Sequence, residues 1–162
     1  LHKKRAEEIF HEFYSFFGLK TCSLRIFSAY GPGLKKQLFW DLYRKSKAGD
    51  TVELFGTGQE TRDFIYVTDL VKAIEAVGLN ASFNGDRLNV GNGVETKIAV
   101  AVQAFYGAFP EEVAYQFMGE NRKGDPINWV ADIRALQAFG YQQEVTLESG
   151  LENYYRWILE QE

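Results

Sequence analysis

The sequence predicts an α/β fold in which the strands pair mostly in parallel. Short β-inclined runs alternate with helical patterns over the first two thirds of the 162 residues, which is the order that βαβ units produce. A hydrophobic content of 46% with only three prolines indicates a packed chain. The length suits a single domain, and neither an internal repeat nor a linker divides it.

The helices are predicted from apolar residues that recur at every third or fourth position. The first runs from about residue 2 to residue 17, and Gly18 is its expected stop. Further helical patterns cover residues 36–48, 69–77, 97–106, 133–139 and 147–160. Thr68, Thr96 and Thr146 are the expected N-caps, because a threonine hydroxyl can accept a free N–H of the first turn.

The strands are predicted from short β-inclined runs between these helices. The runs cover residues 21–27, 52–54, 64–67, 88–90 and 113–117. Residues 28–33 are interpreted as a loop, because glycine and proline are dense there. The strands at 21–27 and 88–90 are expected to belong to a larger parallel sheet and to expose apolar edges when its other strands are absent.

Charge and composition exclude several kinds of partner. A formal net charge of −4 disfavours a nucleic-acid binder, which needs a basic surface for phosphates. Cys22 is the single cysteine, so the chain can form neither an internal disulfide nor a thiolate metal cluster. His2 and His11 lack partners that would suggest a metal site. No apolar run approaches the roughly 20 residues that span a bilayer, so we expect a cytoplasmic protein without a membrane segment.

A candidate anion site lies in the stretch from Val52 to Asp69, VELFGTGQETRDFIYVTD. Arg62 stands directly before a strand, which would fix a planar donor fork suited to phosphate or carboxylate. The alternative is that Arg62 and Asp63 are solvated loop charges. A second pair, Arg122 and Asp125, lies in the polar loop of residues 119–126.

Five motifs, in order, resemble those of one family. They are HKKRAEE at 2–8, LRIFSAYGPG at 24–33, ELFGTGQETRDFIYVTDLVKAI at 53–74, LNVGNG at 88–93 and RKGDP at 122–126. The chain resembles the carboxyl-terminal half of an extended short-chain dehydrogenase/reductase of the NAD-dependent nucleotide-sugar epimerase/dehydratase group. The resemblance implies the last parallel strands of a Rossmann-type protein together with a small mixed α/β substrate domain.

The resemblance implies a cofactor side to the site. It aligns Lys3 with the lysine of the family's Tyr-x-x-x-Lys motif and puts the tyrosine just before Leu1. That lysine lowers the pKa of the catalytic tyrosine and hydrogen-bonds the nicotinamide ribose. Ile26 is assigned to the cofactor side on the same ground. From the sequence alone, Lys3 is an exposed lysine in a first helical turn.

The resemblance also implies a substrate side. Arg62 and Arg122 match the arginines that hold the diphosphate, and Asp125 matches the carboxylate that binds the nucleotide ribose. Ser28 stands where the family often has an asparagine that reaches the sugar. The alternative is that Ser28 caps a turn and makes no contact with the sugar.

The base of the nucleotide would lie against the strand at 52–54. Phe55 and the backbone of Glu53 match the family's lining of the base, and Phe55 as a core residue is the alternative. Tyr66 is expected to pack. Asp69 and Asp132 are assigned to helix capping.

The family's glycine-rich dinucleotide turn is not found in this sequence. We therefore expect residues 1–162 to form one unit, with Rossmann elements at about 1–33 and 68–106, and with the amino-terminal dinucleotide-binding half absent. NAD would be bound mainly by that missing half, and the isolated chain is expected to be inactive.

The complete protein is expected to oxidise C4 of a UDP- or dTDP-linked sugar. An epimerase is favoured over a 4,6-dehydratase or a decarboxylase, and a homodimer through the first helix is expected. The alternative is a non-catalytic module that binds sugar nucleotides or a partner protein.

Overall fold

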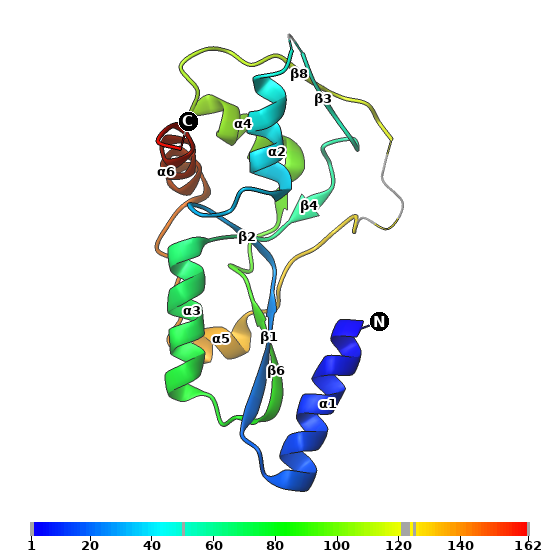
Figure 1. Ribbon diagram of the computed structural model, residues 1–162, viewed down its shortest axis with the longest axis vertical. Helices are drawn as coiled ribbons and strands as arrows, with labels where there is room; N and C mark the ends of the chain where they lie inside the picture. The colour runs from blue at the N-terminus through cyan, green and yellow to red at the C-terminus, as the bar shows by residue number, and fades with distance from the viewer. Residues whose placement is uncertain (1, 50, 121–123, 125, 162) are drawn as a thin grey trace.

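The computed structural model describes residues 2–49, 51–120, 124 and 126–161. The molecule is elongated, with an upper and a lower lobe in the view of Figure 1. The lower lobe contains α1 (His2–Phe17), β1 (Thr21–Ile26), α3 (Val67–Asn80), β6 (Asn84–Val90) and α5 (Arg134–Ala138). The upper lobe contains α2 (Gln37–Ser46), β3 (Val52–Leu54), β4 (Thr61–Arg62), β7 (Thr96–Lys97), α4 (Ile98–Gly107), β8 (Tyr115–Phe117) and α6 (Leu147–Leu159).

The lower lobe is built on the parallel pair β1 and β6. Leu24 lies opposite Leu88 in this register, and both pack with buried residues of α3 and α5. Since side chains alternate across a strand, Arg25 and Arg87 point to the other face, where α1 lies. The predicted parallel pairing is confirmed. In the described residues these two strands pair with each other and form a sheet of their own.

The junction between the lobes is a second parallel pair, β2 (Ser28–Tyr30) and β5 (Phe64–Tyr66). Phe64 and Tyr66 belong to the core of the upper lobe, whereas Ile65 between them belongs to the core of the lower lobe. Because successive side chains of a strand point to opposite faces, β5 contributes residues to both cores. The interpretation of residues 28–33 as a loop was wrong for β2, because the SAY segment gains a partner strand distant in sequence.

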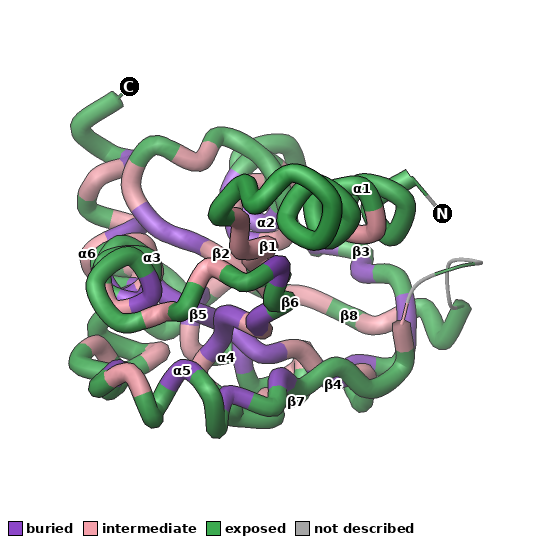
Figure 2. Tube along the Cα trace, turned by 90° about the horizontal axis from the view of Figure 1, so that it is seen from below, coloured by how far each residue is buried: buried purple, intermediate pink, exposed green. Residues whose placement is uncertain are grey.

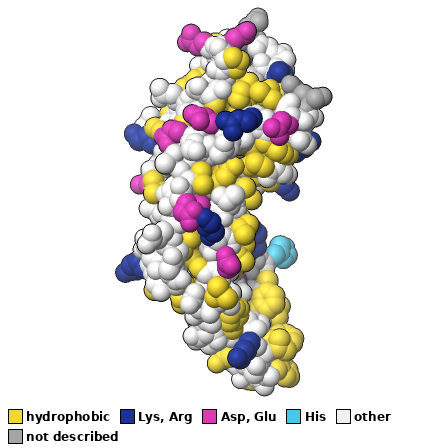
Figure 3. All heavy atoms as spheres, turned by 90° about the vertical axis from the view of Figure 1, so that its left-hand side faces the viewer, with side chains coloured by type: hydrophobic (Ala, Val, Ile, Leu, Met, Phe, Trp, Pro, Cys, Tyr) yellow, Lys and Arg dark blue, Asp and Glu magenta, His cyan; other side chains and the backbone are white. Residues whose placement is uncertain are grey.

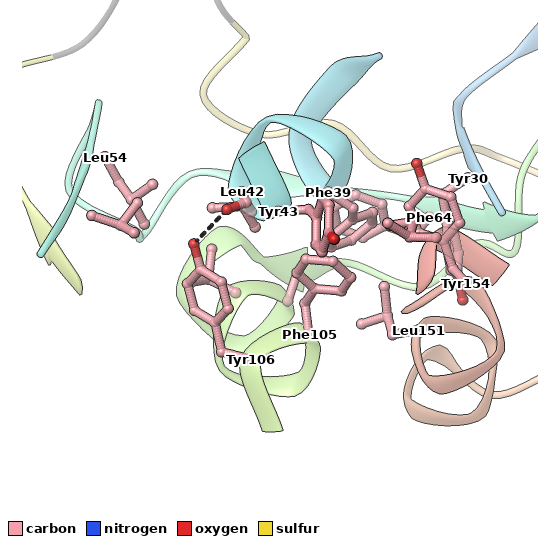
Figure 4. Packing of buried hydrophobic residues seen from close by; sticks show 14 of the residues in the cluster. Tyr30, Phe39, Leu42, Tyr43, Leu54, Phe64, Phe105, Tyr106, Leu151 and Tyr154 are labelled. Atoms are coloured by element: carbon pink, nitrogen blue, oxygen red, sulfur yellow. Dashed lines mark hydrogen bonds between the residues drawn. The ribbon is translucent and has the colours of Figure 1, made fainter. Parts of the chain in front are cut away.

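The upper lobe has an aromatic core (Figure 4). Phe105 of α4 is fully buried, with ring contacts to Phe39 of α2 and to Tyr154 of α6. The Tyr106 hydroxyl donates to the Leu42 carbonyl at 3.1 Å, so α4 and α2 are also joined by a hydrogen bond. The small strands cover the edge of this core, with β3 parallel to β8 and β4 antiparallel to β7.

Asp63 holds together the segments that pass between the lobes. Its buried carboxylate accepts from the backbone N–H groups of Asn92 at 2.8 Å, Gly93 at 2.9 Å and Ala131 at 3.0 Å. Its own carbonyl accepts from Ser28 N–H at 2.9 Å. The interpretation of Asp63 as a solvated loop charge was therefore wrong. The sequence could not reveal this role, because its donors lie far away along the chain.

Asp69 ties the last passage between the lobes in the same way. One oxygen of its buried carboxylate accepts from Glu144 N–H at 3.2 Å and Val145 N–H at 3.0 Å, just before α6. The assignment of Asp69 to helix capping is corrected by these contacts. The expected cap Thr68 lies inside α3, whose N-cap is Tyr66.

Of the other residues predicted to cap or end a helix, some are confirmed and some are not. Thr146 caps α6 as expected by accepting from Ser149 N–H, and Gly18 ends α1 with a positive φ of 66°. Asp132 accepts from the N–H of Arg134, the first residue of α5, but the N-cap of α5 is Ile133, so the capping assignment of Asp132 is corrected. Thr96 belongs to β7, and the N-cap of α4 is Lys97, so that prediction was wrong.

Helix α1 lies on the surface of the lower lobe. None of its described residues is buried, and Phe16 and Phe17 are 78% and 73% exposed. Figure 2 shows α1 as mostly exposed, and Figure 3 shows hydrophobic side chains near the lower end of the molecule. No helix in the described part of the chain is both long enough and apolar enough to cross a membrane.

Candidate functional site

A cavity of about 600 Å³ lies in the upper lobe, next to the junction. Its walls come from β2, α2, the end of β3, β4 and the segment at 126–129. Ser28 and Tyr30 line it directly after the carboxyl end of β1. Ligands of open parallel α/β sheets bind beyond the carboxyl ends of the strands, so the cavity occupies the place where a ligand is expected.

Three of the predicted substrate residues line this cavity together: Ser28, Phe55 and Arg62. They come from β2, from the residue after β3 and from β4, so the fold collects residues that are far apart in sequence. Arg122 and Asp125 lie outside the described residues. Pro126 and Ile127, which follow them in the chain, line the cavity.

Backbone carbonyls anchor the guanidinium of Arg62. Its Nη1 donates to the Thr61 carbonyl at 2.7 Å and to the Pro126 carbonyl at 2.8 Å. Thr61 in turn donates its N–H to the Ile127 carbonyl at 2.8 Å. These contacts fix a planar cation in the wall of a partly apolar cavity, where it can pair with a phosphate or carboxylate.

The ring of Phe55 is exposed and is not part of the core. Phe55 is 53% exposed, and the Lys45 ammonium lies 5.8 Å from its ring centroid. The same ammonium donates to the Glu53 carbonyl at 2.8 Å. A second cavity, of about 530 Å³, adjoins this wall and is lined by Glu53, Phe55 and Lys45.

Lys45 was missed by the sequence analysis, although it lines both cavities. Its neighbours Arg44 and Lys47 are also cations, and the sequence does not say which of the three reaches β3. Trp129 was missed as well. Lys36 lines the cavity, whereas Lys35 lies near the rings of Trp40 and Trp157.

The two predicted cofactor residues lie apart from the cavity. Lys3 is exposed in the first turn of α1, and Ile26 is 45% exposed at the carboxyl end of β1. Figure 1 shows α1 beside β1, with the start of the helix toward the junction. These residues therefore border an open surface of the lower lobe.

Glu60, Tyr30 and Tyr154 line the cavity and make contacts within the fold. Burial opposes the ionisation of Glu60, but hydrogen bonds from Thr57 and Gly58 outweigh it and lower the pKa of this carboxyl. Burial raises the pKa of Tyr154 to about 12 and raises that of Tyr30 still further. Both phenols are neutral at pH 7, and the Tyr30 hydroxyl donates to the Leu147 carbonyl, whereas the Tyr154 hydroxyl donates to the Leu34 carbonyl. Among the described residues no group of three or more His, Cys, Asp or Glu side chains could hold a metal ion.

Comparisons with known proteins agree with the geometry. The model of the family described as "NAD dependent epimerase/dehydratase family" matches residues 1–91, more than half of the chain. An uncharacterized UDP-glucose epimerase, YtcB, of Bacillus subtilis is 29% identical over 158 residues, which cover 96% of this chain and 50% of that protein. A UDP-glucose 4-epimerase of Mycolicibacterium smegmatis is 36% identical over 108 residues, covering 64% of this chain and 33% of that protein.

Solved structures show the same fold. UDP-glucuronic acid 4-epimerase from Bacillus cereus, in complex with UDP-glucuronic acid and NAD, superimposes with a TM-score of 0.86 at 24% identity and covers 96% of this chain and 50% of its own. UDP-N-acetylglucosamine 4-epimerase from Methanobrevibacter ruminantium M1, in complex with UDP-N-acetylmuramic acid, gives 0.83 at 22% identity, with coverage of 98% and 52%. The predicted fold class is confirmed. The chain spans about half the length of YtcB and of these two solved structures.

Proposed function

Because the chain belongs to the NAD dependent epimerase/dehydratase family, we propose that it forms the substrate side of an enzyme that epimerises a UDP- or dTDP-linked sugar at C4. The observation that carries this proposal is the single cavity that gathers Ser28, Phe55 and Arg62. A sugar nucleotide offers the matching chemistry, since it joins a planar base, a dianionic diphosphate and a polyhydroxylated ring.

Each residue has a proposed part in binding the sugar nucleotide. Arg62 would pair with the diphosphate, together with Arg122. Asp125 would accept hydrogen bonds from the nucleotide ribose. Phe55 and the Glu53 backbone would lie against the base, and Ser28 would donate to the sugar near the junction.

The cofactor side is proposed to lie at the carboxyl end of β1. NAD, when bound, supplies the oxidising power for C4 of the sugar. Lys3 and Ile26 are both exposed there and border a surface that a cofactor can cover, so the residues present fit one side of such a group. Lys3 would hold the nicotinamide ribose and keep the pKa of the catalytic tyrosine low.

The exposed face of α1 belongs to the same proposal. In the natural protein at its full length, the amino-terminal dinucleotide-binding half would complete the sheet beside β1, and a second copy would cover the phenylalanines of α1. The isolated chain is then expected to bind sugar nucleotides without converting them.

Turnover by the full-length protein tests the proposed reaction. The protein is incubated with NAD and UDP-glucose, UDP-glucuronic acid or UDP-N-acetylglucosamine, and the products are read by proton NMR. An epimerase yields the C4 epimer, and a dehydratase yields a 4-keto-6-deoxy sugar. Binding without any conversion would instead support a non-catalytic module.

Arg62→Ala tests the substrate side by calorimetry with the same UDP-sugars. Loss of a hydrogen-bonded charge should weaken binding by about 1.5–3 kcal/mol, or roughly 10- to 150-fold. Arg134→Ala is the matched control, because this exposed arginine pairs with Asp132 in the lower lobe. Unchanged affinity in the Arg62 variant would remove this arginine from the site.

A further inference from the structure

Helix α1 needs a specific attachment, because none of its described residues is buried. At its carboxyl-terminal half, the Thr21 hydroxyl donates to the Phe10 carbonyl at 3.0 Å. His11 there lies so close to Gly85 that a Cβ at this glycine would meet the imidazole at 2.7 Å. These contacts lie two or more turns away from the start of the helix.

The amino-terminal half of α1 is attached through Glu7. Its carboxylate accepts from Arg25 Nε at 2.8 Å and from Arg25 Nη2 at 2.6 Å, which is a bidentate pair. Arg87 Nε lies 3.7 Å from the same carboxylate, so both strands of the lower sheet contribute a cation. The side chain of Glu7 is only 14% exposed, and the hydrogen bond from Arg25 lowers the pKa of its carboxyl.

The pair differs from an ordinary surface ion pair on the same helix. Arg5 and Glu8 make a single contact at 3.1 Å within α1, and their side chains are 72% and 35% exposed. Such pairs contribute little. The Glu7–Arg25 pair joins two separate elements with both nitrogens of a planar fork, and this geometry fixes the rotation of the helix about its own axis.

Both ends of the pair adjoin residues of the proposed cofactor side. Lys3 is four residues before Glu7, so the two side chains lie on one face of α1, one turn apart. Arg25 directly precedes Ile26 in β1. We propose that Glu7 and Arg25 are positioning residues that set Lys3 against Ile26 for the cofactor. This inference rests on the proposed function, which assigns those two residues to NAD.

Chemical labelling of Lys3 tests the inference without relying on turnover. The natural full-length protein is treated with an amine-acetylating reagent with and without NAD, and mass spectrometry follows Lys3, with Lys4 as the internal reference. NAD should slow the acetylation of Lys3 in the unaltered protein. Glu7→Gln should abolish this protection, whereas the matched control Glu8→Gln should keep it.

A charge exchange separates positioning from general loss of structure. Arg25→Glu should remove the protection, and the double variant Glu7→Arg with Arg25→Glu should restore it. The kcat of Glu7→Gln should fall by about 10- to 100-fold, the effect of a small misplacement near the chemistry, and the KM for the UDP-sugar should stay unchanged. A merely structural role would lower the melting temperature of Glu7→Gln and leave the protection by NAD intact.

The outcomes distinguish the inference from the proposed function. If NAD does not protect Lys3 in the unaltered protein, the cofactor role of Lys3 fails and the inference fails with it. If NAD protects Lys3 equally in the unaltered protein and in Glu7→Gln, the inference alone is overturned. Failure of the double variant to regain protection also contradicts it.

Discussion

The two lobes differ in how completely they bury their own hydrophobic residues. In the upper lobe, α2, α4 and α6 enclose an aromatic core in which Phe105, Leu151 and Tyr154 are at most 1% exposed. In the lower lobe, α3 and α5 cover one face of the sheet, while α1 on the other face holds phenylalanines that are about half exposed or more. The upper lobe is thus stabilised by its own buried core, whereas the lower lobe leaves apolar side chains of α1 exposed.

This difference separates the proposed substrate side from the proposed cofactor side. The proposed substrate cavity lies in the lobe with the closed core, and the proposed cofactor side lies on the open lobe. The proposed substrate wall is therefore well formed in this chain, because it depends on contacts inside the chain. The proposed cofactor side lies on surface of the lower lobe that the described residues leave open.

The largest expected effect comes from truncating the aromatic core. Phe105→Ala should lower the free energy of unfolding by about 3–5 kcal/mol, because it removes a buried ring and leaves a cavity. Phe16→Ala on α1, where the ring is 78% exposed, should change it by less than about 0.5 kcal/mol. Urea unfolding followed by circular dichroism measures both. Equal losses would mean that the lobes are not different in this respect.

A smaller effect is expected where α6 meets the junction. A Cβ at Gly150 would overlap the Tyr30 hydroxyl and come within 3.0 Å of the Tyr66 ring. Gly150→Ala should therefore destabilise the protein by about 1–3 kcal/mol through overpacking. Gly78→Ala in α3 is the matched control, because nothing lies within 4 Å of that position. It should raise the free energy of unfolding by about 0.5–1 kcal/mol, and the sign of the difference is the decisive result.

A separate effect is expected in alkali, where buried tyrosines begin to lose their protons. Burial raises the pKa of Tyr154 to about 12 and raises those of Tyr30 and Tyr106 further, so the folded state binds their protons more tightly than the unfolded state. Stability should be unaffected below the unfolded pKa of about 10 and should fall between pH 10 and 12. Tyrosinate absorbance and near-ultraviolet circular dichroism follow the change. Titration of these tyrosines at pH 10 without loss of structure would contradict it.

Much of the fold could be predicted because the helical signals are local. The apolar spacing of α1 gave its bounds as the structure has them, and Gly18 marks its end. The strands β2, β4 and β7 escaped prediction, because their local sequences lack a clear β-inclined run and each is formed by pairing with a segment far away in sequence. The caps at Thr68 and Thr96 failed because tertiary contacts, not the threonine hydroxyls, decide where α3 and α4 begin.

The candidate site was predictable to the extent that a motif carries it. Arg62 and Phe55 stand in one long motif, and the structure brings them to the cavity with Ser28. Lys45 and Trp129 were not predictable, because nothing in their local sequence tells that they meet the same wall. The family resemblance assigns roles to Lys3 and Ile26, and these assignments remain proposals.

Asp63 has a consequence for motion. A single buried carboxylate accepts hydrogen bonds from three backbone N–H groups and so joins three segments of the chain at the junction between the lobes. A hinge needs a few residues whose dihedral angles can change freely, and this point offers none without breaking charge-assisted hydrogen bonds. The two lobes should therefore move together as one rigid body. Any closure on a ligand would therefore involve the segments at the rim of the cavity. The distance between the junction and the cavity wall would stay constant.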